Sequence, residues 1–231
     1  MSKENEAINK LTKELNEHNY NYYVLNSPII SDYDFDVLLK ELQSLEEKHP
    51  EFADDNSPTK RVGGDITKNF PSVTHRFPML SLGNSYSKEE ITDFDTRVRK
   101  VIEREIEYIC ELKYDGVAIS LTYQNGELTK AVTRGDGTSG EEVTANIRTI
   151  RSIPLKLKGD FPIDFDIRGE IVFPHANFKK LNEERKELGE PEFANPRNTA
   201  SGTVKMQDSS IVAKRGLDCF LYAVYGNNLS F

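Results

Sequence analysis

The stretch ELKYDGVAISLTYQNGELTKAVTR, residues 111–134, decides the fold of this chain. From Val117 to Tyr123, apolar residues alternate with small or polar ones, which is the period of a β-strand that buries one face. Asn125-Gly126 is a residue pair preferred in tight hairpin turns, and residues 128–134 supply a returning strand. The sequence therefore predicts an antiparallel β-hairpin directly after a segment that contains a lysine.

Lys113 is the candidate functional residue of this stretch, because it lies between two apolar runs and close to two carboxylates. If Tyr108 to Lys113 forms a strand, the side chains of Glu111 and Lys113 share one face and converge beside Asp115. That arrangement suggests a lysine used as a nucleophile. An ordinary charged edge strand that ends in an Asp-Gly turn would give the same motif, so the interpretation depends on the rest of the chain.

The first fifty residues predict a helical hairpin. Apolar residues recur with helical spacing over the first 23 positions. A Ser-x-x-Asp cap at Ser31 begins a second helix, and Pro50 ends it. We divide the chain into a helical unit with a polar linker, residues 1–70, and a main domain, residues 71–231.

The main domain is predicted to combine helices with further strands. Ser87 begins a helix through a capping box. Residues 163–173 alternate in character, so Arg168 and Glu170 point away from the apolar face of a strand, and a last strand covers residues 219–225. The expected fold class is α+β, with a helical hairpin followed by mainly antiparallel sheets that helices flank.

Composition restricts the classes of function. The 231 residues are 37% hydrophobic and 29% charged, as in ordinary globular proteins. The net charge of −8 argues against a wide nucleic-acid surface, so any DNA contact is expected to be local. The sequence has no apolar stretch of membrane-spanning length and a polar N-terminus, so we expect a cytoplasmic protein. Cys110 and Cys219 lack metal-ligand spacing, so we expect reduced thiols in the core and no zinc.

The motif Lys-x-Asp-Gly at Lys113 resembles that of the nucleotidyltransferase superfamily of polynucleotide ligases and capping enzymes. The wider chain resembles one branch of it, the bacterial NAD-dependent DNA ligases. Four further segments carry this resemblance in the family's order: MLSLGN (residues 79–84), TRGDGTSGE (133–141), RGE (168–170) and FANPRNTASG (193–202).

The resemblance implies a reaction for Lys113. Its amine would attack the α-phosphate of NAD, form lysyl-AMP and release nicotinamide mononucleotide (NMN), with Mg²⁺ offsetting charge on the phosphates. A free lysine is almost entirely protonated at neutral pH, so such a site has to favour the neutral amine by desolvation or nearby cations. The adenylate would then pass to the 5′-phosphate of a nick in double-stranded DNA, which the whole enzyme seals in replication and repair. No obligate protein partner is expected.

The resemblance also implies roles for individual residues. Glu111 would contact the adenine, Asp115 would lie near the ribose and the metal, and no complete metal-ligand set is assigned. Tyr23 and Phe35 stand where many relatives have His and Tyr, and Lys205 stands where they have Arg. The residues implied for the rest of the adenosine half are Ser81, Leu82, Arg134 and Glu170. Those implied for the nicotinamide half are Tyr22, Tyr23, Asp32, Tyr33, Asp34, Phe35 and Asp36. Those implied for phosphates at the nick are Arg197 and Lys205.

Alternatives stay open for the helical hairpin and for the function. Aromatic residues and acids near a helix start also occur as a core stripe and as charges that complement the helix dipole. Two further lysine motifs of the family would follow Phe231, so we expect a fragment with weak self-adenylation and no sealing activity. We also expect the hairpin to close over bound NAD. The alternative functions are an ATP-dependent ligase or capping-type nucleotidyltransferase, and a non-catalytic NAD-binding module.

Overall fold

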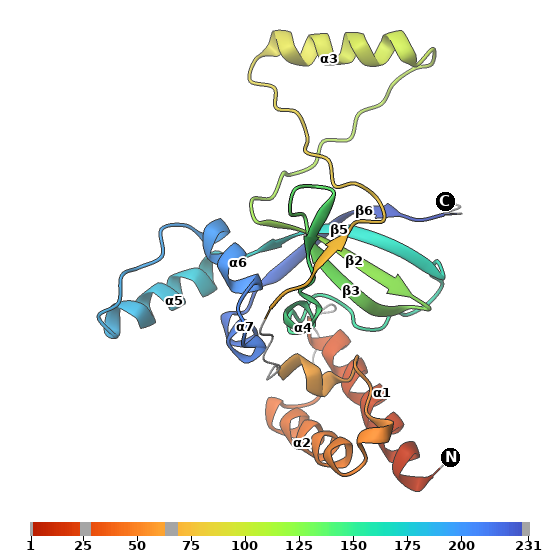
Figure 1. Cartoon of the computed structure of the whole chain (residues 1–231), viewed down its shortest axis with the longest axis vertical. Coiled ribbons are helices and arrows are strands. Elements are labelled where there is room, and N and C mark those ends of the chain that lie inside the picture. Colours follow the sequence, from red (N-terminus) through yellow and green to blue (C-terminus); the bar gives the residue numbers. More distant parts are fainter. Residues whose placement is uncertain (1, 24–28, 63–68, 228–231) are drawn as a thin grey trace.

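The computed structural model describes residues 2–23, 29–62 and 69–227, and it confirms the predicted α+β fold (Figure 1). The main sheet is antiparallel with strand order β3-β2-β5-β6, and β1 pairs with β4 in a separate small sheet. The strands are β1 (Ser72–Thr74), β2 (Val117–Gln124), β3 (Glu127–Thr133), β4 (Ser139–Glu141), β5 (Asp164–Val172) and β6 (Asp218–Tyr225).

The predicted hairpin of β2 and β3 is confirmed. Asn125 and Gly126 both have positive φ angles, 51° and 79°, which is the turn geometry that matches the twist of two antiparallel strands. β2 also pairs along its whole length with β5, so β2 is an inner strand of the sheet and β3 forms one edge. The predicted strands at 163–173 and 219–225 correspond to β5 and β6.

Helices cover one face of this sheet. Ile119 and Leu121 of β2 and Ile171 of β5 are fully buried against residues such as Ile147 and Val204 from the covering helices. Burial of this apolar face supplies the main stabilisation of the domain, because each large aliphatic side chain contributes about 1.5–3 kcal/mol. The helices of the main domain are α3 (Lys88–Val101), α4 (Thr144–Ile147), α5 (His175–Glu187), α6 (Pro196–Val204) and α7 (Ser209–Arg215).

The predicted helical hairpin is also confirmed. It consists of α1 (Lys3–Tyr23) and α2 (Asp32–Lys48), with short 3₁₀ turns at Pro50–Phe52 and Pro58–Val62. The Ser31 hydroxyl accepts a hydrogen bond from the Asp34 N–H at 3.1 Å, as the cap motif predicted. Between the helices lie the fully buried Leu15 and Leu42, and Leu39 packs against this core.

The helical hairpin packs against the main domain through polar contacts. The Lys156 ammonium lies 2.6 Å from the Asp54 carboxylate and 3.1 Å from that of Glu127. The Lys158 ammonium lies 4.1 Å from the centre of the Tyr20 ring. The linker is packed around Asn56 and Ser57, which are buried, while its glycines at 63 and 64 lie outside the described residues.

Loss of the Asp54–Lys156 pair should destabilise the chain modestly. Burial raises the pKa of Asp54, but hydrogen bonds from Lys156 and the Asn56 N–H outweigh it and hold that pKa below its ordinary value. We expect Lys156→Met to lower the free energy of unfolding by about 1 kcal/mol in urea titrations near neutral pH. A lowered carboxyl pKa stabilises the folded state above about pH 4, the ordinary range of the group, so the effect should fade as the pH falls below that value.

The matched control for this prediction is Lys179→Met, which removes an ammonium from an exposed pair on α5. That change should leave the free energy of unfolding within about 0.5 kcal/mol of the parent. Equal effects of the two substitutions, or an effect of Lys156→Met that persists at pH 2, would contradict the role assigned to the pair.

Helix α3 projects from the rest of the chain on two extended arms (Figure 1). Its N-terminal cap at Ser87 is confirmed, but none of its residues is buried.

The predicted strand at 108–113 is wrong: the segment forms no ladder with any described strand, and Ile109 and Leu112 are 89% and 79% exposed. Alternation alone suggested a strand, yet a strand also needs a partner. Cys110 is likewise exposed rather than in the core.

Candidate functional site

An open groove with a volume of about 1670 Å³ crosses the other face of the sheet. Its lining begins at Met79 and comes from the segment before α3, the segment around Lys113, the loop after β3, strands β5 and β6, and helix α6. The predicted site residues that line it are Ser81, Leu82, Glu111, Lys113, Asp115, Arg134, Glu170, Arg197 and Lys205.

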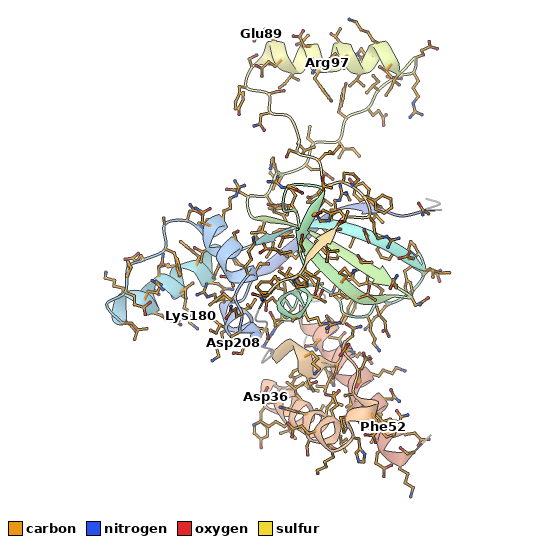
Figure 2. The ribbon with its side chains drawn as sticks, viewed as in Figure 1. Asp36, Phe52, Glu89, Arg97, Lys180 and Asp208 are labelled. Carbon is orange, nitrogen blue, oxygen red and sulfur yellow. The ribbon has the colours of Figure 1, made fainter. Side chains whose placement is uncertain are left out.

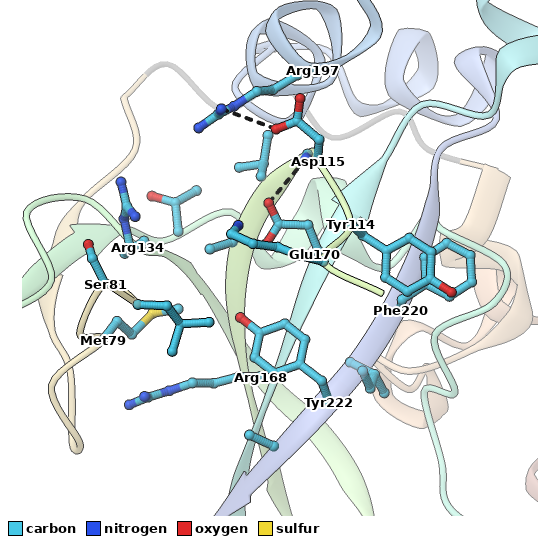
Figure 3. Close-up of a pocket in the computed structure, with 18 of the residues that line it drawn as sticks. Met79, Ser81, Tyr114, Asp115, Arg134, Arg168, Glu170, Arg197, Phe220 and Tyr222 are labelled. Atoms are coloured by element: carbon cyan, nitrogen blue, oxygen red, sulfur yellow. Dashed lines mark hydrogen bonds and ion pairs between the residues drawn. The ribbon is translucent and has the colours of Figure 1, made fainter. Parts of the chain in front are cut away.

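Side-chain contacts, rather than a strand ladder, fix the segment that carries Lys113. The Tyr114 ring stacks on the Phe220 ring of β6, with centroids 4.0 Å apart and an interplanar angle of 8°. The Gly116 N–H donates to Glu170 Oε1 at 3.1 Å, and Asp115 Oδ1 lies 3.1 Å from Arg197 Nη1 (Figure 3). The three residues that directly follow Lys113 are thus tied to β6, α6 and β5.

Glu170 is the half-buried carboxylate of the groove. Burial raises its pKa above the ordinary value, and the Gly116 N–H together with the nearby charges of Lys113 and Arg197 opposes that rise. The carboxylate therefore lies among cations in a partly desolvated position. Such perturbed groups in a cleft are typical of functional sites.

Arg134 enters the groove from a tight loop between β3 and β4. The Asp136 carboxylate accepts hydrogen bonds from the Thr138 and Ser139 N–H groups, both at 2.8 Å, and these bonds lower its pKa. A side chain at Gly137, where φ is 93°, would place its Cβ 2.8 Å from the Met79 oxygen. Two backbone segments approach each other there, so the glycine is needed for packing of the protein itself.

Tyr222 is a groove residue that sequence reasoning missed. The register of β5 and β6 passes from Arg168 opposite Ala223 to Gly169 opposite Leu221, which leaves Tyr222 as the extra residue of a β-bulge. Bulges redirect side chains, and the Tyr222 ring lies in the groove (Figure 3). The available signal was Gly169 within a strand pattern, because such a glycine marks a bulge or a close backbone approach.

Two cations of the groove, Arg197 and Lys205, come from α6 and its C-cap. Asn195 caps this helix by accepting from the Asn198 N–H at 2.8 Å, which places Arg197 in its first turn. The Arg197 guanidinium pairs with Asp115, and the Lys205 ammonium pairs with Glu141. An anionic ligand in the groove would replace these carboxylates as the partner of each cation.

The predicted nicotinamide-binding residues of α2 lie away from the groove. Tyr33 and Asp36 are both exposed, and Asp36 lies at the end of the molecule opposite α3 (Figure 2). The Asp34 carboxylate accepts a hydrogen bond from the Ser31 hydroxyl in the first turn of α2, and Phe35 packs against the helical core, as the structural alternative expects of an acid near a helix start and of an aromatic core residue. The side chains of Tyr22, Tyr23 and Asp32 lie outside the described residues.

The described residues contain neither a preformed metal cage nor a membrane-spanning helix. Among them, no group of three His, Cys, Asp or Glu side chains is arranged to hold a metal ion. Among the described helices, none is both long enough and apolar enough to cross a membrane. Magnesium usually keeps several waters and binds through one or two carboxylates together with substrate phosphates, so Asp115 at the rim of the groove suits it without a protein cage.

Comparison with known proteins identifies the family. Residues 67–230 match the NAD-dependent DNA ligase adenylation domain, and residues 1–63 match the DNA ligase-like N-terminal NAD⁺-binding domain. The chain is 61% identical over 227 residues to a DNA ligase of Flavobacterium johnsoniae, an alignment that covers 98% of this chain and 34% of the relative.

Other relatives give the same result. A DNA ligase of Christiangramia forsetii is 63% identical over 96% of the chain and 33% of its own length, and one of Bacteroides fragilis is 59% identical over 97% and 34%. The chain therefore spans about a third of the length of the curated relatives it matches. The family resemblance predicted from the motifs around Lys113 is thus confirmed, and the chain belongs to the NAD-dependent DNA ligases through their N-terminal and adenylation domains.

Proposed function

We propose that the groove binds the adenosine half of NAD and that Lys113 takes the adenylyl group from it. The observation that carries this proposal is the position of Lys113 in one groove with the Glu170 carboxylate and the Arg134 and Arg197 guanidiniums. A nucleophile, a partly buried carboxylate and cations for phosphate oxygens are the parts that phosphoryl transfer needs.

The transfer replaces one bond to phosphorus by another. The neutral Lys113 amine forms an N–P bond to the α-phosphorus, the bond to the bridging oxygen breaks, and NMN leaves with that oxygen. The amine loses one proton to solvent or to a nearby carboxylate. The product is lysyl-AMP. Magnesium, when bound, would neutralise charge on the phosphates beside Asp115, which is a supporting role rather than a step of its own.

The groove also offers contacts for the base and the sugar. The exposed face of Tyr222 suits stacking with an aromatic base. The Glu111 carboxylate, at the rim, can accept a hydrogen bond from the exocyclic amine of that base. Ser81 and Leu82 form the opposite rim, where Leu82 is 78% exposed and free to cover a ligand. Each of these roles is part of the proposal.

The nicotinamide half needs a second surface, which we assign to the helical hairpin. Tyr33 and Asp36 present an aromatic ring and a carboxylate, which suit a cationic pyridinium and ribose hydroxyls. Because these residues do not line the groove, the hairpin has to change its position relative to Lys113 when NAD binds. The Asp54–Lys156 pair and the Lys158–Tyr20 contact would open in that change.

In the whole protein, we propose that the adenylate passes to the 5′-phosphate of nicked double-stranded DNA and that sealing serves replication and repair in the cytoplasm. Arg197 and Lys205 would contact DNA phosphates locally, which is compatible with the net charge of −8. No obligate protein partner is part of this proposal.

The proposal is tested by titrating the chain calorimetrically with NAD, ATP and AMP in the presence of Mg²⁺. We expect NAD and AMP to bind, and ATP to bind at least about tenfold more weakly than NAD. Asp36→Asn should weaken NAD and leave AMP unchanged, because only NAD carries a nicotinamide half. Equal binding of ATP and NAD would favour the ATP-dependent alternative, and an absence of NAD binding would refute the proposed function.

A further inference from the structure

Arg168 is a buried cation beneath the groove, and the proposed chemistry does not use it. It lies in β5 between Ser120 of β2 and Ala223 of β6 and is 7% exposed. Among the described residues, no carboxylate pairs with it, since its Nη2 donates instead to the oxygens of Phe77 at 2.7 Å and Pro78 at 2.9 Å. A buried charge without a counter-ion is costly, so these neutral contacts have to compensate for its desolvation.

The geometry of this contact requires a guanidinium. The plane of Arg168 covers the Tyr225 ring, with its central carbon 3.8 Å from the ring centre, while one edge nitrogen reaches both carbonyls. Tyr225 in turn packs against Phe77, with ring centroids 5.8 Å apart. A lysine ammonium would reach a carbonyl but would lack the flat face, so the two residues are not interchangeable here.

The segment that Arg168 holds has little other backbone support. Between residues 75 and 82, the backbone hydrogen bonds to other described residues are those from the His75 N–H to the Thr138 oxygen and from the Met79 N–H to the Gly137 oxygen, both at 2.8 Å. Pro78 has no N–H to contribute. Ser81 and Leu82, at the end of this segment, form one rim of the groove, and Figure 3 shows the Arg168 side chain running below Tyr222 and Met79.

We propose that Arg168 is a positioning residue: by binding the Phe77 and Pro78 carbonyls over Tyr225, it sets the distance between the rim at 79–82 and Tyr222, and so sets the affinity for the nucleotide. This inference rests on the proposed function, because it concerns the same groove. Arg168 is part of the wall of the groove, and its guanidinium contacts the Phe77 and Pro78 oxygens and the Tyr225 ring.

The test compares Arg168→Met and Arg168→Lys with the matched control Arg99→Met, which removes a guanidinium from the remote helix α3. NAD affinity is measured by calorimetry, and the exchange rate of the Met79 amide by NMR. We expect Arg168→Met to weaken NAD at least about tenfold and to speed exchange of that amide, Arg168→Lys to restore affinity partly, and Arg99→Met to change neither. A folded Arg168→Met variant with parental affinity and exchange would overturn the inference.

Two further measurements keep the test decisive. If Arg168→Met does not fold, Tyr225→Leu removes the ring that supports the guanidinium, and unchanged exchange of the Met79 amide in that variant would overturn the inference. If the parent itself fails to bind NAD, the proposed function is refuted, while the exchange measurement still reports on the Arg168 contact without any nucleotide. In Arg168→Ala, added guanidinium should restore slow exchange and ethylammonium should not.

Discussion

Lys113→Ala is expected to abolish covalent adenylate on this chain while leaving NAD bound. The adenylyl group needs a nucleophile on phosphorus, whereas binding is distributed over Arg134, Arg197 and the rims of the groove. We expect the rate of adenylate formation to fall at least about a thousandfold. Intact mass after long incubation with NAD and Mg²⁺, followed by peptide mapping, measures both the presence of the adenylate and the residue that carries it.

Two variants sharpen this experiment. Lys113→Arg keeps the positive charge near Glu170 but offers no neutral amine at accessible pH, so it should bind NAD and form no adenylate. Lys180→Ala removes an exposed ammonium from α5 and should behave as the parent. Adenylate that persists in Lys113→Ala, or that maps to another lysine of the parent, would contradict the assignment of the nucleophile.

The elements that sequence predicted well are those with local causes. The turn at Asn125-Gly126 needs only the positive φ angles of two neighbouring residues, and the start of α2 needs only the Ser31 hydroxyl and the Asp34 N–H. Periodicity also placed Arg168 and Glu170 on the face of β5 away from the apolar core, because side-chain alternation holds once a strand is paired on both sides.

The features that sequence did not predict depend on distant partners. The segment at 108–113 has the alternation of a strand, but no described strand pairs with it, and its position follows from the Tyr114–Phe220 stack across 106 positions of sequence. Arg168 was quoted as part of a motif, yet its role comes from the carbonyls of Phe77 and Pro78, about ninety residues earlier. Such contacts leave no local pattern.

Gly116, the last residue of the lysine motif, has a structural requirement of its own. A Cβ on this residue would lie 2.0 Å from the Ile171 oxygen and 2.9 Å from the Ile171 carbon, both backbone atoms of β5. The neighbouring Val117 begins the ladder with Ile171, so neither backbone is free to move without breaking the central strand pair. The small residue after Asp115 is therefore needed for the sheet as well as for the groove.

Gly116→Ala is accordingly expected to lower the free energy of unfolding by about 3 kcal/mol or more, which corresponds to a fall of roughly 6–12 °C in Tm for a chain of this size. The matched control is Gly202→Ala in α6, where an added Cβ meets nothing within 4 Å and alanine favours the helix. Calorimetric melting should show the control at or above the parental Tm. If both variants melt with the parent, β2 and β5 do not approach as closely at Gly116 as described, and the attachment of Lys113 to β5 through the Gly116–Glu170 hydrogen bond loses its basis.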